Sequence, residues 1–279
     1  MSDPHLEKLR AIFAEMESVL VCYSGGVDSA LVLAIAHDVL GPERAIGMTA
    51  VSPSLAPYEK ELAISVAKRI GARHELVESH EIDDPNYQRN GPDRCFYCKS
   101  ELYTLSSAKQ KEWNAAFVAN GTNLDDLGDH RPGLEAAKRA GVRSVLVEAG
   151  FRKEDVRRVA ELVGLSVWDK PASACLSSRI PYGTSVTRER LAQIAGLESE
   201  VRALGLRQVR VRLHELGESS SLARVEVARD ELAKAFDARE AIAVAGRRFG
   251  FSYVTLDLEG YRTGSHNEVL MGRALRVVS

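Results

Sequence analysis

The segment Ser24–Ser29, with the sequence SGGVDS, constrains the fold of this chain more than any other. It follows the apolar run Val19–Tyr23 and opens a helical run from Ala30 to Leu40, so the order is strand, glycine turn, helix. A turn of this kind concentrates free backbone N–H groups and the positive end of a helix at one point, which suits a polyphosphate. The segment predicts a nucleotide site, with an ordinary strand-to-helix turn as the alternative.

Individual residues of this turn suit different tasks. Gly25 and Gly26 let the backbone approach phosphate oxygens without a Cβ atom in the way. Ser24 and Ser29 offer hydroxyl donors, and Asp28 is suited to orienting the turn or recruiting Mg²⁺. No lysine follows the second glycine, so the segment is not the Walker pattern, and γ-phosphate transfer is disfavoured.

Helical and strand patterns alternate along residues 1–168, which predicts a doubly wound parallel sheet, an α/β fold. About five strands are expected, at residues 19–23, 45–51, 74–77, 116–119 and 144–147. Helices are expected at residues 4–17, 30–40, 57–70, 98–113, 132–140 and 153–163. In such a sheet, ligands bind at the carboxyl ends of the strands.

The pattern changes at residues 169–186, which contain two prolines and no periodicity and are predicted to form an active-site loop and linker. Residues 187–279 predict a smaller α+β domain. Its expected elements are a helix from Thr187, strands 208–213 and 223–227, a helix 229–247 and a strand 253–256.

The composition favours a globular protein of the cytoplasm. Hydrophobic residues make up 45% of the 279 residues, which is ample for a buried core. A net charge of -2 gives no electrostatic reason to expect a nucleic-acid partner. No apolar stretch of about 18 residues is present, and the N-terminus is charged throughout, so neither a membrane span nor a secretory signal is expected.

The four cysteines indicate metal ligands or reactive thiols rather than disulfides. Cys95 and Cys98 have the two-residue spacing that lets both sulfurs bind one metal or cluster, just before an expected helix. Cys175 falls in the aperiodic loop, where exposure favours a thiolate. Three thiolates suit a 4Fe-4S cluster with one open iron, or zinc with a fourth ligand, while inert thiols are the alternative. Cys22 lies in an apolar strand and is expected in the core.

Two further groups suit ligand binding. The segment 121–126 follows an expected strand, and its residues Gly121, Asn123, Asp125 and Asp126 suit a nucleotide and its Mg²⁺, although an Asx-type turn would also explain the pattern. Arg210 and Arg212 alternate along a strand and therefore share a face, where they form a fork for phosphate or carboxylate. A solvated strand face is the alternative for the arginines.

The Ser24–Ser29 turn resembles the signature of the PP-loop ATP pyrophosphatase family, of the adenine nucleotide alpha hydrolase-like fold, which cleaves ATP between the α- and β-phosphates and adenylates a substrate. Nearly the whole chain resembles LarE, the family of PP-loop sulfur transferases that makes the nickel-pincer nucleotide cofactor of lactate racemase. The segments that carry this resemblance are 24–29, 94–99, 121–129, 131–133, 175–183, 209–212, 223–227 and 258–264.

The resemblance implies that ATP adenylates a carboxylate of pyridinium-3,5-biscarboxylic acid mononucleotide and that sulfur then displaces AMP. Cys175 matches the sulfur-donor position of the family. With Cys95 and Cys98 as well, the chain is similar to the form in which three cysteines bind a 4Fe-4S cluster whose open iron carries a sulfide. The alternative is the single-cysteine form, in which the donor gives up its own sulfur and becomes dehydroalanine.

The resemblance also implies that Arg210, Arg212 and Arg262 hold the substrate's phosphate or carboxylates, in a second domain that binds substrate and mediates oligomerisation. It further implies a homo-hexamer and sulfide or a cysteine desulfurase as the sulfur source. One rival interpretation is a tRNA thiolase or another PP-loop adenylating enzyme, which should carry a basic RNA-binding module or an ammonia source. Another is a non-catalytic ATP- or metal-sensing module, which would release no pyrophosphate.

Overall fold

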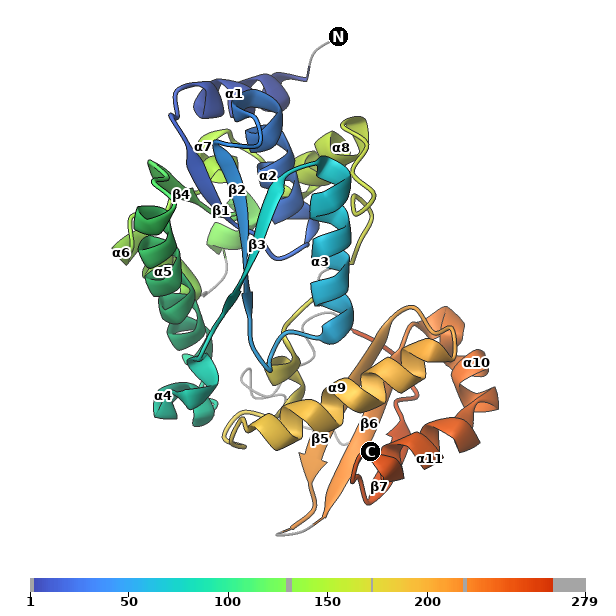
Figure 1. The fold of residues 1–279 in the computed structure, drawn as a ribbon. Helices are drawn as coiled ribbons and strands as arrows, with labels where there is room; N and C mark the ends of the chain where they lie inside the picture. The colour runs from blue at the N-terminus through green and yellow to red at the C-terminus, as the bar shows by residue number, and fades with distance from the viewer. Residues whose placement is uncertain (1–2, 129–131, 172, 218–219, 263–279) are drawn as a thin grey trace. The chain divides into compact units, whose positions relative to one another are not determined.

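The computed structural model describes residues 3–128, 132–171, 173–217 and 220–262. The chain divides into two compact units, Met1–Ser173 and Ala174–Ser279, each with its own sheet (Figure 1). The division falls inside the stretch 169–186 that the sequence predicts as a loop and linker. None of the described helices is long and apolar enough to cross a membrane.

Within its described residues, the first unit has a four-stranded parallel sheet in the order β3-β2-β1-β4. The strands are β1 (Val19–Cys22), β2 (Ala45–Val51), β3 (Arg73–Glu78) and β4 (Phe117–Ala119). Every residue of β1 is buried, as expected for a parallel strand that is covered on both faces. The order reverses at β1, because β2 and β3 lie on one side of it and β4 on the other. This reversal places a topological switch point at the carboxyl ends of β1 and β4.

Helices cover both faces of this sheet, which confirms the predicted doubly wound fold (Figure 1). They are α1 (Pro4–Ala14), α2 (Val27–Leu40), α3 (Pro57–Ile70), α4 (Pro85–Gln88), α5 (Arg94–Glu112), α6 (Pro132–Arg139), α7 (Val145–Glu148) and α8 (Lys153–Leu162), with 3-10 turns η1 (Glu81–Asp83) and η2 (Leu124–Gly128). Local sequence explains several ends. Asp3 caps α1, Pro57 begins α3, and Gly71 ends α3 in a left-handed conformation at φ 79°.

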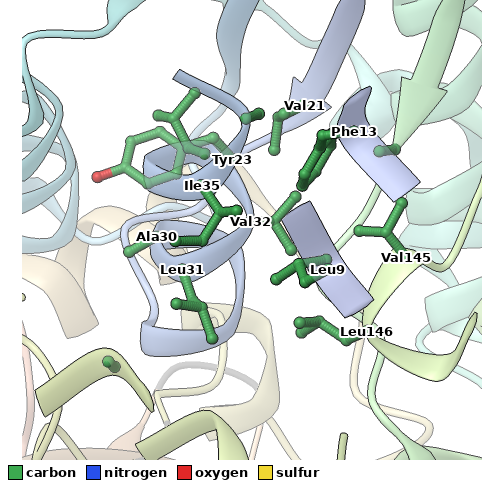
Figure 2. Packing of buried hydrophobic residues seen from close by; sticks show 14 of the residues in the cluster. Leu9, Phe13, Val21, Tyr23, Ala30, Leu31, Val32, Ile35, Val145 and Leu146 are labelled. Carbon is green, nitrogen blue, oxygen red and sulfur yellow. The ribbon is translucent and has the colours of Figure 1, made fainter. Parts of the chain in front are cut away.

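Alternate residues of β1 contribute their side chains to two hydrophobic cores, one on each face of the sheet. Val19 and Val21 face the helices α1, α2, α3 and α8, and Figure 2 shows Leu9 and Phe13 of α1 packed against α2 in this core. Leu20 and Cys22 face the opposite side, where α5 and α6 pack. Cys22 is 9% exposed, so its predicted place in the core is confirmed.

The prediction of a strand at 144–147 is wrong, because these residues begin the short helix α7. Only Arg143, the residue just before this segment, bridges to β4, at Ala119. The chain then turns at Ser144, whose carbonyl accepts a hydrogen bond from Glu148 N at 3.0 Å. Val145 and Leu146 are fully buried in the α1 and α2 core (Figure 2). A four-residue apolar run is equally compatible with a buried strand and a buried helical turn, and here tertiary packing decides.

The second unit has a mixed sheet in the order β5-β6-β7, with β5 and β6 antiparallel and β6 and β7 parallel. Its strands are β5 (Val209–Glu215), β6 (Ser221–Val227) and β7 (Tyr253–Leu256), and its helices are α9 (Arg188–Ala203), α10 (Leu232–Asp237) and α11 (Arg239–Arg248), with turns η3 (Leu176–Arg179) and η4 (Arg229–Glu231). The predicted single helix over 229–247 is therefore wrong. It breaks at Ala238, whose ψ of 7° interrupts the helical backbone between Asp237 and Arg239, and no glycine or proline signals this interruption.

Candidate active site

The Ser24–Ser29 turn joins β1 to α2 and is held by its own hydroxyl groups. Ser29 Oγ accepts a hydrogen bond from Ser24 N at 3.1 Å and donates one to the carbonyl of Gly26 at 3.2 Å. Gly26 is the N-cap residue of α2 and provides no side-chain cap, an arrangement that suits an anion at this helix end. Gly25 has φ +74°, and a Cβ atom there would lie 2.9 Å from the Cα of Ala63, so this close approach requires glycine.

The loop after β4 lies against this turn, as the switch point predicts. A Cβ atom on Gly121 would lie 2.7 Å from the backbone nitrogen of Ser29, so the two segments are in direct backbone contact. Asn123 Nδ2 donates to Asp28 Oδ1 at 3.0 Å. The structure therefore brings together the two loops that the sequence selects, at one edge of the sheet.

Lys153 is a residue of this edge that the sequence reasoning missed. It is the first residue of α8, and its ammonium group forms an ion pair with Asp28. The side chains of Lys153 and Asp28 are 35% and 23% exposed, so the pair is reachable by a ligand. A lysine at a helix N-terminus opposes the helix dipole, and the carboxylate of Asp28 compensates for this placement only in the folded structure.

Asp125 and Asp126 both bind backbone groups of the surrounding loops. Asp125 accepts hydrogen bonds from Lys153 N at 2.7 Å and Arg152 Nη1 at 2.9 Å. The hydrogen bond from the Lys153 amide, together with Arg152, holds the pKa of Asp125 below its usual value. Asp126 Oδ2 accepts from Asn123 N at 3.1 Å. These contacts order the loop around Asn123 and the start of α8, and a direct role in binding Mg²⁺ stays a prediction.

Cys95 and Cys98 lie inside α5, which begins at Arg94, so the prediction that they precede a helix is wrong. Because the two cysteines are at positions i and i+3, with two residues between them, both lie on one face of the helix. Cys95 is exposed and Cys98 is half-buried, and neither forms a disulfide. Burial opposes the charge of Lys99, but Tyr103 and the cysteine thiols around it hold the pKa of Lys99 above its usual value. In the described part of the first unit, no third metal-ligating side chain joins this pair.

Cys175 belongs to the second unit, where it begins the turn η3. Its carbonyl oxygen accepts hydrogen bonds from Ser178 N at 3.0 Å and Ser178 Oγ at 2.8 Å. The residue is exposed and forms no disulfide. The backbone at Cys175 is thus fixed while the residue itself is exposed.

The predicted arginines differ in their surroundings. Arg212 is 4% exposed, and its guanidinium binds Glu226 through Nε at 3.0 Å and the carbonyl of Ser178 through Nη1 at 2.8 Å. Arg210 lies over the ring of Tyr261, 4.4 Å from its centre, and burial together with the nearby arginines lowers its pKa. In the described ranges no carboxylate lies within ion-pair distance of Arg210, which makes it the better placed of the two to bind an anion.

Arg262 is the last described residue and pairs with Glu259 at 2.9 Å. A pocket of about 600 Å³ is also present in the first unit, at the other end of α2, where His37, Asp38 and Leu165 contribute to its lining. Because the Ser24–Ser29 turn is at the start of α2, this pocket is not the predicted nucleotide site.

The parallel sheet and its glycine turn define a PP-loop protein that acts on adenine nucleotides, and a family model described as NAD synthase matches residues 8–94. The chain is 37% identical to the pyridinium-3,5-bisthiocarboxylic acid mononucleotide synthase of Lactiplantibacillus plantarum, over 94% of the chain and 93% of that protein. It is 45% identical to an uncharacterised protein of Synechocystis sp., over 97% and 99% of the two chains, and 26% identical to one of Methanocaldococcus jannaschii, over 88% and 92%. The chain therefore belongs to the LarE family of PP-loop ATP-dependent sulfur transferases, as its motifs predict.

Proposed function

We propose that this enzyme adenylates a carboxylate of pyridinium-3,5-biscarboxylic acid mononucleotide and then replaces AMP by sulfur. The observation that carries the proposal is the match along nearly the whole chain to a relative named for the bisthiocarboxylic product. In the first step a carboxylate oxygen attacks the α-phosphorus of ATP, the α–β phosphoanhydride bond breaks and pyrophosphate leaves. In the second, a sulfur nucleophile attacks the acyl carbon and AMP leaves with the bonding electrons.

The residues of the first unit support the adenylation step. Backbone N–H groups and hydroxyls of Ser24–Ser29 would bind the phosphates at the start of α2. Asp28 would bind the Mg²⁺ that accompanies ATP, since Mg²⁺ is commonly held by one or two carboxylates together with substrate phosphates. Lys153 now pairs with Asp28 and would then turn to a phosphate oxygen. This exchange would neutralise negative charge as pyrophosphate departs.

The second unit would bind the substrate. Arg210 is the better placed arginine, because its guanidinium rests on Tyr261 and has no carboxylate partner in the described residues. Arginine binds phosphate and carboxylate through two parallel hydrogen bonds, which fixes the orientation of the substrate as well as its position. Arg212 and Arg262 would complete this anion site.

We also propose that Cys95, Cys98 and Cys175 hold a 4Fe-4S cluster. The donor set fits, because two cysteines share a face of α5, Cys175 is exposed, and none of the three is in a disulfide. When bound, such a cluster would supply an open iron site for a sulfide. The alternative is that Cys175 forms a thioester with the substrate. Loss of its Cα proton would then break the Cβ–Sγ bond, leaving a thiocarboxylate and dehydroalanine.

Anaerobic purification followed by iron and sulfide analysis and an absorption spectrum tests the cluster. We expect iron and sulfide in the wild type and in Cys22→Ala, whose thiol is buried in the core, and loss of both in Cys95→Ala. The Cys95→Ala protein should also fail to perform multiple turnovers. A colourless, iron-free wild type whose mass falls by one H2S for each product would overturn the cluster and establish Cys175 as the donor.

Pyrophosphate release tests the adenylation step. We expect release that depends on ATP and on the pyridinium dicarboxylate mononucleotide. Binding of ATP without release would indicate a sensing module instead, and release that depends on tRNA would indicate a thiolase.

A further inference from the structure

Arg179 is fully buried and bridges three parts of the second unit. Its Nε donates to Glu198 Oε1 at 2.9 Å, and its Nη2 lies 3.4 Å from Glu198 Oε2, so one edge of the guanidinium faces the whole carboxylate. Glu198 lies on α9, and its Oε1 also accepts a hydrogen bond from Val211 N of β5 at 3.0 Å. Each side chain of the pair is 1% exposed. Glu198 therefore fixes the position of the guanidinium relative to α9, on which Glu198 lies, and to β5, whose Val211 N–H it binds.

The other edge of the guanidinium binds the backbone of the turn that carries Cys175. Nη1 of Arg179 donates to the carbonyl of Ala174 and to that of Cys175, the latter at 2.9 Å, and lies 3.2 Å from Ser178 Oγ. Arg212 donates to the carbonyl of Ser178 at 2.8 Å. Buried arginines thus hold both ends of the turn.

A buried ion pair is not in itself needed for stability, because apolar replacements of such pairs are often neutral or stabilising. The hydrogen bonds of Arg179 to a carboxylate on one side and to backbone carbonyls on the other place a more specific requirement on this position. Only a planar group with several fixed donors can bind a carboxylate along one edge and two carbonyls along the other, and the single ammonium of lysine cannot. The arrangement matches what a reactive side chain requires, namely a fixed backbone beneath it.

We propose that Arg179, oriented by Glu198, is a positioning residue that fixes Cys175 for the sulfur-transfer step. Arg179 contacts the Cys175 backbone and acts on the thiol only through the turn. Adenylation is proposed for the nucleotide turn of the other unit, to which neither Arg179 nor Glu198 belongs. The inference rests on the proposed role of Cys175 in sulfur transfer.

Two variants test the inference. Arg179→Lys keeps a positive charge, and Arg179→Met/Glu198→Gln removes both charges while leaving an amide oxygen to accept from Val211 N. In both we expect substrate-dependent pyrophosphate release within about twofold of wild type and sulfur transfer lower by about tenfold to a hundredfold. We also expect faster hydrogen exchange at the Ser178 amide, which donates to the Cys175 carbonyl. Glu200→Gln is the matched control, since Glu200 is on the same helix but pairs at the surface with Arg248.

Several results would overturn the positioning role of Arg179 or the function on which it rests. Unchanged exchange at Ser178 in folded variants would show that Arg179 does not fix the turn, and faster exchange with full sulfur transfer would show that the fixing is irrelevant to chemistry. If the double variant fails to fold in a thermal melt, Arg179→Lys carries the test. A wild type that makes no thiocarboxylate would overturn the proposed function, whereas a fully active wild type beside fully active variants would overturn only the role of Arg179.

Discussion

The turns at Ser24–Ser29 and at Cys175–Arg179 are held in opposite ways. The first is held by hydroxyl groups of its own residues, and its ion pair between Asp28 and Lys153 remains partly exposed. The second is held from beneath by the buried pair of Arg179 and Glu198. An exposed pair can exchange partners when a ligand arrives, whereas a buried pair cannot be opened without a large desolvation cost. On the proposed roles, the exposed pair allows Lys153 to move from Asp28 to a phosphate, while the buried pair only has to hold the backbone that presents Cys175.

Replacing Cys175 by alanine should give the largest effect and separate the two turns most clearly. We expect sulfur transfer to be lost, by roughly a thousandfold or more, because either proposed mechanism needs this thiol. Substrate-dependent pyrophosphate release should continue, since the nucleotide turn is untouched. Product analysis by mass spectrometry alongside a pyrophosphate assay measures both steps. Sulfur transfer that survives in Cys175→Ala would remove this residue from the mechanism.

Lys153→Met should have the next largest effect, and it should impair the adenylation step rather than sulfur transfer. We expect pyrophosphate release to fall by about tenfold to a hundredfold, the value of a lost charge-assisted hydrogen bond of about 1.5–3 kcal/mol. Steady-state kinetics with varied ATP measure the loss. Lys68→Met is the control, because Lys68 is an exposed lysine on α3. Equal activity of the two variants would contradict the assignment of Lys153 to the phosphates.

Gly121→Ala tests the backbone contact that joins the two loops of the nucleotide site. The added Cβ atom would lie 2.7 Å from Ser29 N, so the loop must move away from the turn. Overpacking of this kind costs about 1–3 kcal/mol, and we expect a KM for ATP raised by about tenfold together with a lower Tm. Gly128→Ala is the matched control, since nothing lies within 4 Å of a Cβ atom there. Identical behaviour of the two variants would show that the contact is not needed.

The smallest expected effect is a pH dependence of thermal stability that arises from His74. This histidine lies close to Thr49, which binds the carbonyl of Tyr23, the residue before the nucleotide turn. Thr49 Oγ1 donates to the carbonyl of Tyr23 at 2.7 Å and lies 2.8 Å from His74 Nε2. Burial lowers the pKa of His74, so the folded state disfavours the protonated ring. Its stability contribution is present above the ordinary histidine pKa of about 6.5 and is lost as the pH falls below it. Thermal melts should therefore show a larger drop in Tm on acidification for the wild type than for His74→Gln, and parallel curves would exclude His74 as the cause.

The parts of the fold that local patterns determine could be predicted from the sequence. The apolar run of β1, the glycine turn and α2 follow from neighbouring residues, and the meeting of the Ser24 and Gly121 loops follows from the rule for parallel sheets. The break at Ala238 and the helix at Val145–Glu148 could not be predicted, because packing against other elements decides them.

The supporting residues of the candidate site were also out of reach of the sequence. Lys153 lies 125 positions from Asp28, and Glu198 lies 19 positions from Arg179. Neither pair has a spacing that a helix or strand period would reveal. Charge pairs that form only in the tertiary structure leave no local pattern, so the sequence selects candidate reactive groups more readily than it selects the residues that hold them.

The burial of Cys22 has a practical consequence for chemical labelling. Its sulfur lies 3.3 Å from Ser106 Oγ in the core between β1 and α5, and burial raises the pKa of its thiol. A protonated, enclosed thiol reacts slowly with alkylating reagents. In the folded protein free of a cluster, alkylation should therefore label the exposed Cys175 and Cys95 without modifying Cys22, and Cys22 need not be removed before the exposed thiols are counted.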